Sequence, residues 1–232
     1  MDRRQFLTAT TAVALTSAAT PANAWPNACI TRLPKSPTPR LAWTLDDGMS
    51  TTALAHYVNL LEAHPNLRMT FFVLSEAKSW AALKKPLTAL AATGQIQLGN
   101  HTKSHRDLTK LSTLHIQQEL RACEHFIQDT FNVDPGPYFR PPYGYIDQRV
   151  VNAARAIGYT KPTLWLGSTG AGSVRSSATD WELCKKWMTN GRIVIDHANS
   201  EVTVQNFSKI LNLLHNRNLK TVTLNDAFHT GN

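Results

Sequence analysis

Short apolar runs alternate with longer stretches of helical periodicity along the chain. The apolar runs, rich in β-branched and aromatic residues, predict strands at residues 41–45, 68–74, 95–98, 162–166, 192–197 and 221–224. A further strand is expected to end in the Pro-Pro-Tyr-Gly turn of residues 138–144. Apolar positions at helical spacing predict helices at residues 51–64, 80–92, 112–131, 147–158, 180–190 and 202–216.

Capping residues mark several helix ends. Thr51 or Thr52 is expected to cap the first helix, Ser112 the long one, and Thr179 or Asp180 the helix that follows a Gly/Ser-rich loop at 167–179. Gly158 is a natural C-cap.

The strict alternation of strand and helix predicts an α/β fold. Parallel strands with helices packed outside them produce this order, and about seven strands suit a distorted (β/α) barrel. In such a barrel the reactive groups lie at the C-terminal ends of the strands.

The ends of the chain differ from its middle. Arg3 and Arg4 precede a modest apolar run and the small residues Ala22-Asn23-Ala24, so residues 1–24 are predicted to be a twin-arginine signal peptide. That run is shorter than the ~20 residues that span a bilayer, and no other stretch comes close. We therefore expect an exported, periplasmic or secreted protein, recognised by the twin-arginine export machinery. Residues 25–39 read as an extended lead-in and residues 40–232 as one catalytic domain.

Composition narrows the class of protein. A hydrophobic content of 42% is that of a globular protein, and the net charge of +8 favours a basic solvated surface over a site for a polyanion. No nucleic-acid-binding signature is present, so a nucleic-acid partner is not expected. The cysteines Cys29, Cys123 and Cys184 lack metal-ligand spacing and are interpreted as structural or incidental.

Two histidines follow the strand at 95–98. His101 and His105 are four residues apart, and on a helical turn this spacing places both imidazoles on one face. Neutral imidazole is a ligand of zinc and its neighbours. The spacing alone is weak evidence, because two solvated histidines on a helix are commoner than two ligands.

Two carboxylates follow the strand at 41–45. Because successive strand residues point in opposite directions, Asp46 and Asp47 are expected to do different work, one holding a metal and the other facing bound water. Two histidines and one carboxylate complete a catalytic metal site with an open position. Arg140 and His197 also fall at strand ends, which predicts that all these groups meet at one mouth of the barrel.

With these residues assembled, the chain resembles the polysaccharide deacetylases of the NodB-homology type, the family-four carbohydrate esterases. The resemblance rests on Thr44-Leu-Asp-Asp-Gly48, Gly99-Asn-His-Thr-Lys-Ser-His105, Arg140-Pro-Pro-Tyr-Gly144 and Ile193-Val-Ile-Asp-His197, with Asp180-Trp181 as a weaker fifth stretch. These stretches run in the family's order and span nearly all of residues 40–232. The family's distorted, incomplete (β/α) barrel agrees with the predicted elements.

The resemblance implies a role for each matching position. Asp47, His101 and His105 would hold a divalent metal, most often Zn²⁺. Asp46 would be the catalytic base, with Arg140 pairing with it. His197 would be the general acid, oriented by Asp180. Tyr143 would offer its backbone N–H to the oxyanion, and Trp181 and Ile195 would wall the pocket for the acetyl methyl group.

Two departures from the family pattern affect these roles. The aspartate that usually stands shortly before Asp-Trp is missing, which bears on Asp180. Asp196 replaces an apolar residue directly before His197, and strand alternation should turn it away from the metal.

The expected activity is metal-dependent hydrolysis of acetyl groups from N-acetylated glycans, of the chitin-oligosaccharide or peptidoglycan type. The chemistry would use an Asp base, metal-bound water and a His acid. Two alternatives remain open at this point: an esterase for O-acetyl glycans such as xylan, and a catalytically silent carbohydrate-binding homologue.

Overall fold

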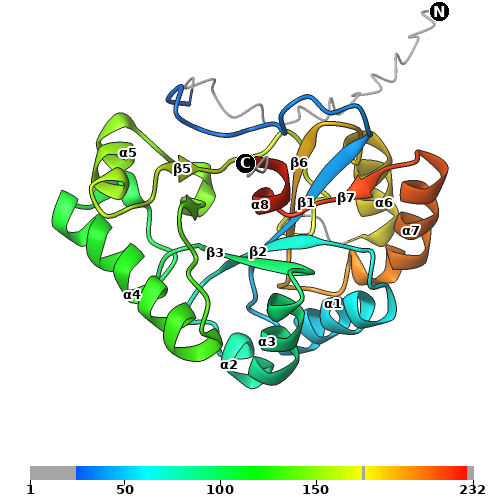
Figure 1. The fold of residues 1–232 in the computed structure, drawn as a ribbon, viewed down its shortest axis with the longest axis horizontal. Helices are drawn as coiled ribbons and strands as arrows, with labels where there is room; N and C mark the ends of the chain where they lie inside the picture. The colour runs from blue at the N-terminus through cyan, green and yellow to red at the C-terminus, as the bar shows by residue number, and fades with distance from the viewer. Residues whose placement is uncertain (1–24, 174–175, 229–232) are drawn as a thin grey trace, which may run out of the picture.

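Seven parallel strands form one curled sheet with the long helices packed on its outer side (Figure 1). The computed structural model describes residues 25–173 and 176–228, so the predicted signal peptide at 1–24 lies outside the described residues. The strands are β1 (Arg40–Asp47), β2 (Met69–Val73), β3 (Ile96–Asn100), β4 (Tyr138–Phe139), β5 (Lys161–Pro162), β6 (Arg192–His197) and β7 (Lys220–Thr221). Their order in the sheet is β5-β4-β3-β2-β1-β6, with β7 paired to β1. The predicted α/β barrel class is confirmed.

The helices follow the predicted positions, with several corrections at their ends. They are α1 (Thr51–Ala63), α2 (Lys78–Ala82), α3 (Lys84–Ala92), α4 (Thr113–Phe131), α5 (Gln148–Arg155), α6 (Ser177–Trp187), α7 (Phe207–Asn216) and α8 (Leu224–Phe228), with short 3₁₀ turns η1 (Leu108–Lys110), η2 (Pro142–Gly144) and η3 (Val204–Asn206). The single helix expected at 80–92 is two helices that meet at Leu83, and part of the strand expected at 221–224 begins α8. Among the described residues, no helix is long and apolar enough to cross a membrane.

The caps show how local chemistry sets helix ends. Ser112 caps α4 as predicted, accepting a hydrogen bond from the backbone N–H of His115. Ser50 rather than Thr51 or Thr52 caps α1, and α6 begins after Ser176 rather than at Thr179 or Asp180. In α5 the C-cap position is Ala156, with Gly158 two residues beyond it.

The lead-in bridges the two edges of the sheet. β5 and β6 end the sheet without a direct ladder between them, and Ile30 pairs with Thr163 on one side while Arg32 pairs with Arg192 on the other. The Leu164 N–H donates to the Ile30 carbonyl at 2.8 Å, and the Leu33 N–H donates to that of Gly191 at 3.0 Å. The lead-in is therefore a structural part of the barrel wall.

The two faces of the sheet bury different cores. Side chains on the outer face pack against the helices, as Leu41, Trp43 and Leu45 do in the largest apolar cluster. A smaller cluster fills the barrel from inside, and α8 contributes Leu224 and Ala227 to it. This inner cluster ends before the polar residues at the C-terminal ends of the strands. The fold therefore leaves a hollow at the C-terminal mouth of the sheet.

Candidate active site

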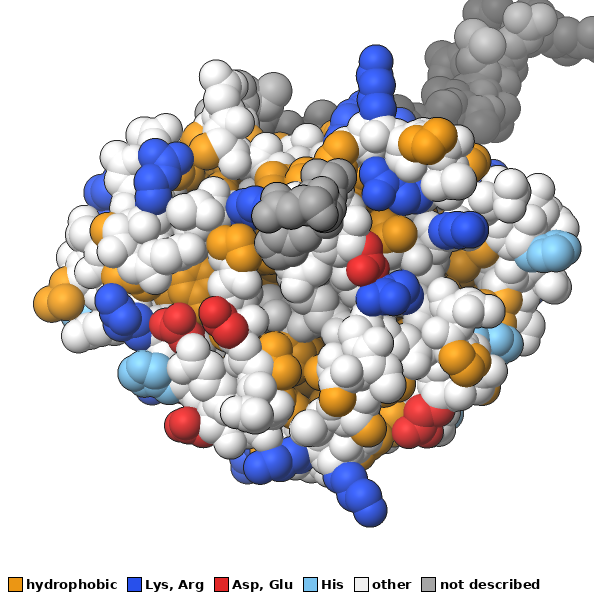
Figure 2. Space-filling model, in the orientation of Figure 1, with side chains coloured by type: hydrophobic (Ala, Val, Ile, Leu, Met, Phe, Trp, Pro, Cys, Tyr) orange, Lys and Arg blue, Asp and Glu red, His pale blue; other side chains and the backbone are white. Residues whose placement is uncertain are grey.

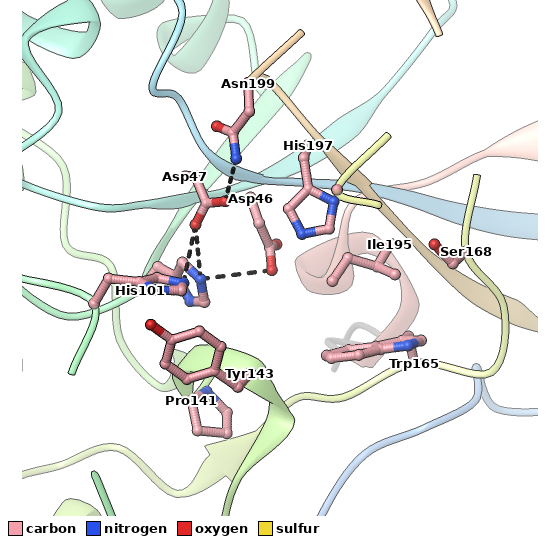
Figure 3. Close-up of a pocket in the computed structure, with 12 residues that line it drawn as sticks. Asp46, Asp47, His101, Pro141, Tyr143, Trp165, Ser168, Ile195, His197 and Asn199 are labelled. Carbon is pink, nitrogen blue, oxygen red and sulfur yellow. Dashed lines mark hydrogen bonds and ion pairs between the residues drawn. The ribbon is translucent and has the colours of Figure 1, made fainter. Parts of the chain in front are cut away.

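A cavity of about 360 Å³ opens at the C-terminal ends of β1, β3 and β6. Figure 3 shows its side chains converging from these strands and from the loops after β4 and β5. Its lining consists of Asp46, Asp47, His101, His105, Pro141, Tyr143, Trp165, Ser168, Gly172, Ile195, His197 and Asn199. Of the groups predicted to meet at one mouth of the barrel, five line the cavity: Asp46, Asp47, His101, His105 and His197. The sixth, Arg140, is buried behind Asp46.

Asp47, His101 and His105 form a group with the geometry of a metal site. Asp47 Oδ1 lies 3.2 Å from His101 Nε2 and 3.3 Å from His105 Nε2. The ligand atoms of the three residues all lie within 4.8 Å of one another. Asp47 Oδ1 is buried and accepts no hydrogen bond within the described residues, as expected of a carboxylate oxygen that can bind a cation. One carboxylate oxygen and two imidazole nitrogens are a donor set that fits a divalent transition metal.

The tautomer of His101 follows from its other ring nitrogen. His101 Nδ1 lies 2.7 Å from the carbonyl oxygen of Arg140. Because a carbonyl can only accept, Nδ1 carries the proton in the neutral ring, which leaves the Nε2 lone pair facing Asp47 and a cation.

The two histidines meet by a route other than the one predicted. Residues 101–107 form an irregular loop and not a helical turn. Thr102 and His105 have positive φ angles of 72° and 57°. The Thr102 N–H donates to Asn100 Oδ1 at 2.9 Å, and the His105 N–H donates to Thr102 Oγ1 at 3.2 Å. Side-chain hydrogen bonds thus bend the backbone so that both imidazoles face Asp47.

Asp46 and Asp47 both face the cavity, contrary to the expectation from strand alternation. Asp47 leaves the strand conformation with φ of 68°, and the turn continues through Gly48 at φ of 80°. The alternation rule holds only for extended backbone, so the left-handed turn brings both carboxylates to one side. Their partners still differ, because Asp46 contacts Arg140 and Asp47 contacts the imidazoles.

Arg140 is fully buried and anchors Asp46. Its Nη1 donates to Asp46 Oδ1 at 2.5 Å and to Thr44 Oγ1 at 2.8 Å, while Nε donates to the carbonyl of Thr163 at 3.1 Å. The guanidinium lies 4.2 Å above the Phe72 ring. Burial lowers the pKa of Arg140, and the adjacent Asp46 carboxylate opposes that shift. The second oxygen of Asp46 is left free to face the cavity, 3.7 Å from His101 Nε2.

The carboxylates and imidazoles of the site are strongly coupled. Burial alone would raise the pKa of Asp47, but the adjacent imidazoles of His101 and His105 lower it far below its ordinary range. Burial alone would lower the pKa of His101, but Asp46 and Asp47 raise it above 6.5. A cation here therefore competes with a proton on His101 for the same nitrogen.

His197 ends β6 and points into the cavity beside Asp46 (Figure 3). Its Nδ1 is buried without a hydrogen-bond partner in the described ranges. Gly172 packs against the ring so closely that a Cβ there would lie 2.7 Å from His197 Cε1. Within the described residues, packing against Gly172 therefore holds the His197 ring.

The expected role of Asp180, orienting His197, requires a contact between the two side chains, and the structure shows none. It is fully buried, and its carboxylate accepts from Thr203 Oγ1 at 2.8 Å and from Asn206 Nδ2 at 2.9 Å. Burial raises the pKa of Asp180. Asp180 lies on α6, and its carboxylate faces Thr203 and Asn206 instead of the cavity.

Asp196 occupies a buried hydrogen-bond network behind His197. As predicted, strand alternation turns its side chain away from the cavity, where it accepts from Trp43 Nε1, Tyr57 OH, Thr169 Oγ1 and the backbone N–H of His197 at 2.6–2.9 Å. Thr203 Oγ1 lies 3.0 Å from Asp196 Oδ1 and 2.8 Å from Asp180 Oδ1. One hydroxyl proton serves only one acceptor, so a proton on Asp180 would satisfy both contacts.

Removing the charge of Asp196 is expected to destabilise the fold. Asp196→Asn places an NH₂ group among donors, leaving several of them unpaired in the core, and we expect a loss of roughly 2–5 kcal/mol in the free energy of unfolding. Urea unfolding followed by fluorescence measures it, with exposed Glu62→Gln as the control. A variant that unfolds at the wild-type urea concentration would contradict the role assigned to this network.

The apolar wall of the cavity differs from the expected one. Ile195 lines the cavity as predicted, but Trp181 packs against the outer core with Lys185 and Lys209 over its ring. Trp165 lines the cavity instead. Tyr143 lies at the rim with a positive φ of 61°, so the turn after Arg140 is held in an uncommon backbone conformation.

Asn199 is a site residue that the sequence analysis did not identify. Its Nδ2 donates to Asp47 Oδ2 at 2.7 Å, and its Oδ1 accepts from the Met49 N–H at 3.0 Å. The bond occupies one oxygen of Asp47 and leaves Oδ1 for the imidazoles and a cation. No motif pointed to it, because its partner lies on a different strand far away in the chain.

We expect Asn199→Ala to weaken cation binding by about 10–100-fold, the usual effect of losing a group that orients a metal ligand. Competition with a chromogenic chelator measures the affinity. The matched control is Asn152→Ala, which removes an exposed amide on α5. Unchanged affinity in Asn199→Ala would show that Asp47 needs no such support.

The three cysteines are free in the structure, and Cys123 and Cys184 are buried. Burial raises the pKa of the Cys29 thiol to about 11 and that of Cys123 to about 12. Neither is therefore a nucleophile at neutral pH.

The fold and the site define a parallel (β/α) barrel with a candidate metal centre at its C-terminal mouth. The family model for polysaccharide deacetylases matches residues 34–162. This chain belongs to the polysaccharide deacetylase family, which confirms the resemblance seen in the sequence.

Individual relatives agree with that assignment. Chitin deacetylase 1 of Cryptococcus neoformans is 36% identical over 143 residues, which is 60% of this chain and 28% of the relative. The peptidoglycan-N-acetylglucosamine deacetylase PgdA of Listeria monocytogenes is 27% identical over 202 residues, 86% of this chain and 41% of the relative. This chain thus spans less than half the length of either relative.

The fold is shared with solved structures. The Bc1960 peptidoglycan N-acetylglucosamine deacetylase superposes with a TM-score of 0.76 at 23% identity, covering 88% of this chain and 94% of that one.

Proposed function

We propose that this protein is a metal-dependent hydrolase that removes acetyl groups from N-acetylated glycans of the chitin-oligosaccharide or peptidoglycan type. The observation that carries the proposal is the meeting of Asp47, His101 and His105 directly beside Asp46, which is paired with a buried Arg140. Relatives named as chitin and peptidoglycan deacetylases support this class of substrate.

Asp47, His101 and His105 would hold the cation, and Zn²⁺ is the ion that suits their donor set best. Such a cation would polarise the acetyl carbonyl and make a nearby water more acidic. The residues around the cation would then have to remove a proton from water, donate a proton to the leaving amine and stabilise the oxyanion.

Asp46 is proposed to take the proton from the attacking water. One of its oxygens is fixed by Arg140 and the other faces the cavity, so the base is both oriented and exposed to substrate. Because the ion pair with Arg140 is buried, its geometry is set before the substrate arrives.

His197 is proposed to protonate the leaving amine, which departs poorly as an anion. Tyr143 is proposed to direct its backbone N–H at the oxyanion, and Ile195 with Trp165 to surround the acetyl methyl group. Asp180, which faces away from the cavity, is given no part in this mechanism.

An acetate-release panel tests the proposal. Purified protein is incubated with N-acetylglucosamine oligomers, peptidoglycan and O-acetylated xylan, with and without a chelator and added Zn²⁺. We expect acetate from the N-acetylated substrates, loss of release with chelator and recovery with Zn²⁺. Release from xylan alone would favour the O-acetyl esterase, and release from none would favour a carbohydrate-binding homologue.

We further propose that residues 1–24 direct export by the twin-arginine route, because Arg3 and Arg4 precede an apolar run and a small-residue cleavage pattern. Fractionation of cells producing the full-length chain tests this, since intact precursor found only in the cytoplasm would contradict it.

A further inference from the structure

Two neighbouring tyrosines lie exposed at the rim of the cavity. Tyr143 and Tyr145 are 58% and 51% exposed, and they are among the four large apolar side chains exposed to that extent in the described chain. Their ring centroids lie 5.6 Å apart with the planes tilted by 38°. Together they form an exposed aromatic surface, which we call the tyrosine platform.

The platform continues directly from the candidate metal site. The Tyr143 ring packs edge-on against His105 at 4.6 Å, and His105 packs against His101 at 5.0 Å. A row of rings thus leads from the buried ligand His101 out to Tyr145, which is not part of the cavity lining. A ligand that extends from the cavity past the Tyr143 ring would reach Tyr145, whose ring is adjacent.

The backbone beneath the platform is fixed. The Gly144 N–H donates to the carbonyl of Pro141 and the Tyr145 N–H donates to that of Pro142, both at 3.1 Å. Gly144 has φ of 70°, and a Cβ there would lie 2.9 Å from Trp165 Cη2, so the turn is wedged against the cavity wall. A fixed backbone reduces the conformational entropy that the platform loses when a ligand binds it.

We propose that the tyrosine platform is a sugar subsite, which binds the pyranose ring next to the sugar whose acetyl group enters the cavity. A pyranose presents an apolar C–H face with hydroxyl groups at its edge, which matches the apolar face and polar tip of tyrosine. Two rings are too small an area to hold a protein partner. The inference rests on the proposed function, because it takes the reacting sugar to occupy the cavity.

Binding measured without turnover tests the platform. Isothermal titration calorimetry is performed on the Zn²⁺-loaded Asp46→Asn protein and on the same protein carrying Tyr145→Ala or Tyr145→Phe. The ligands are N-acetylglucosamine, its tetramer and acetylated xylotetraose. We expect Tyr145→Ala to raise the Kd of the preferred tetramer roughly 3–10-fold and to change monosaccharide binding much less. Tyr145→Phe, which keeps the ring, should bind like the Tyr145 protein.

The controls separate this inference from the proposed activity. Leu114→Ala removes an equally exposed apolar side chain from α4, outside the cavity lining, and should not change tetramer binding. An unchanged Kd in Tyr145→Ala, an equal loss in Tyr145→Phe, or no binding of either tetramer would overturn the platform. If wild-type protein releases no acetate while tetramer binding still depends on the ring of residue 145, the proposed hydrolysis fails and the subsite stands.

Discussion

Asp46→Asn is expected to slow acetate release by about a hundred- to ten-thousandfold while the cation stays bound, which is the usual worth of a general base. Asparagine keeps the shape of the side chain and an oxygen for Arg140, but its amide cannot accept the proton of the attacking water. Asp46 contacts Arg140 at 2.5 Å, whereas the oxygen that both imidazoles face belongs to Asp47.

The measurement pairs turnover with cation content. Initial rates on an N-acetylated oligomer are compared with Zn²⁺ bound per protein, and exposed Asp129→Asn on α4 serves as the control. If Asp46→Asn loses its cation, then Asp46 is the metal ligand and Asp47 the base, the reverse of the roles proposed here. If Asp46→Asn has the wild-type rate, then Asp46 is not the base.

The parts of the fold that the sequence predicted are those set by local patterns. The buried strands β1, β2 and β6 and the helix α4 with its Ser112 cap follow from runs of apolar residues and from one hydrogen bond near the helix start. The lead-in could not be predicted in this way. Ile30 pairs with Thr163 and Arg32 pairs with Arg192, both more than a hundred residues later, and nothing in the lead-in's own sequence indicates those partners.

The site shows the same division. The residue types and their positions at strand ends were enough to predict that Asp47, His101 and His105 lie at one mouth of the barrel. The periodicity rules, however, gave the wrong local backbone geometry for all three. Asp47 and His105 have positive φ angles, which neither strand nor helix spacing allows for. Strained backbone of this kind persists where surrounding contacts hold it, and such contacts come from the tertiary structure.

The remaining wrong predictions concern residues whose positions depend on loops and on helix packing. Trp165 and Gly172 reach the cavity through the segment after β5, whose path depends on pairing with β6, as in the bridge between Ser168 and Ile195. Asp180 was assigned from its place in a motif, but α6 turns it toward Thr203 and Asn206. A motif identifies the residue type at a position, whereas the direction of its side chain depends on how the helix that carries it packs against its neighbours.

His101→Ala is expected to lower Zn²⁺ affinity by more than about a hundredfold, a larger loss than removing a group that only orients a ligand, and to abolish acetate release at low Zn²⁺. The change deletes the Nε2 donor that faces Asp47 and leaves the Arg140 carbonyl without its imidazole partner. Because burial and the neighbouring carboxylates make His101 part of the core, the variant also risks misfolding.

His105→Ala separates loss of the ligand from loss of the fold. The His105 side chain is 27% exposed, so truncating it disturbs little packing, yet it removes the second imidazole from the group. We expect weak Zn²⁺ binding in both variants by chelator competition, with partial recovery of acetate release at high Zn²⁺. Exposed His125→Ala on α4 should behave as wild type. Full Zn²⁺ occupancy in a folded His105→Ala protein would mean that the cation lies elsewhere, and the assignment of Asp46 as the base beside it would fall with the metal site.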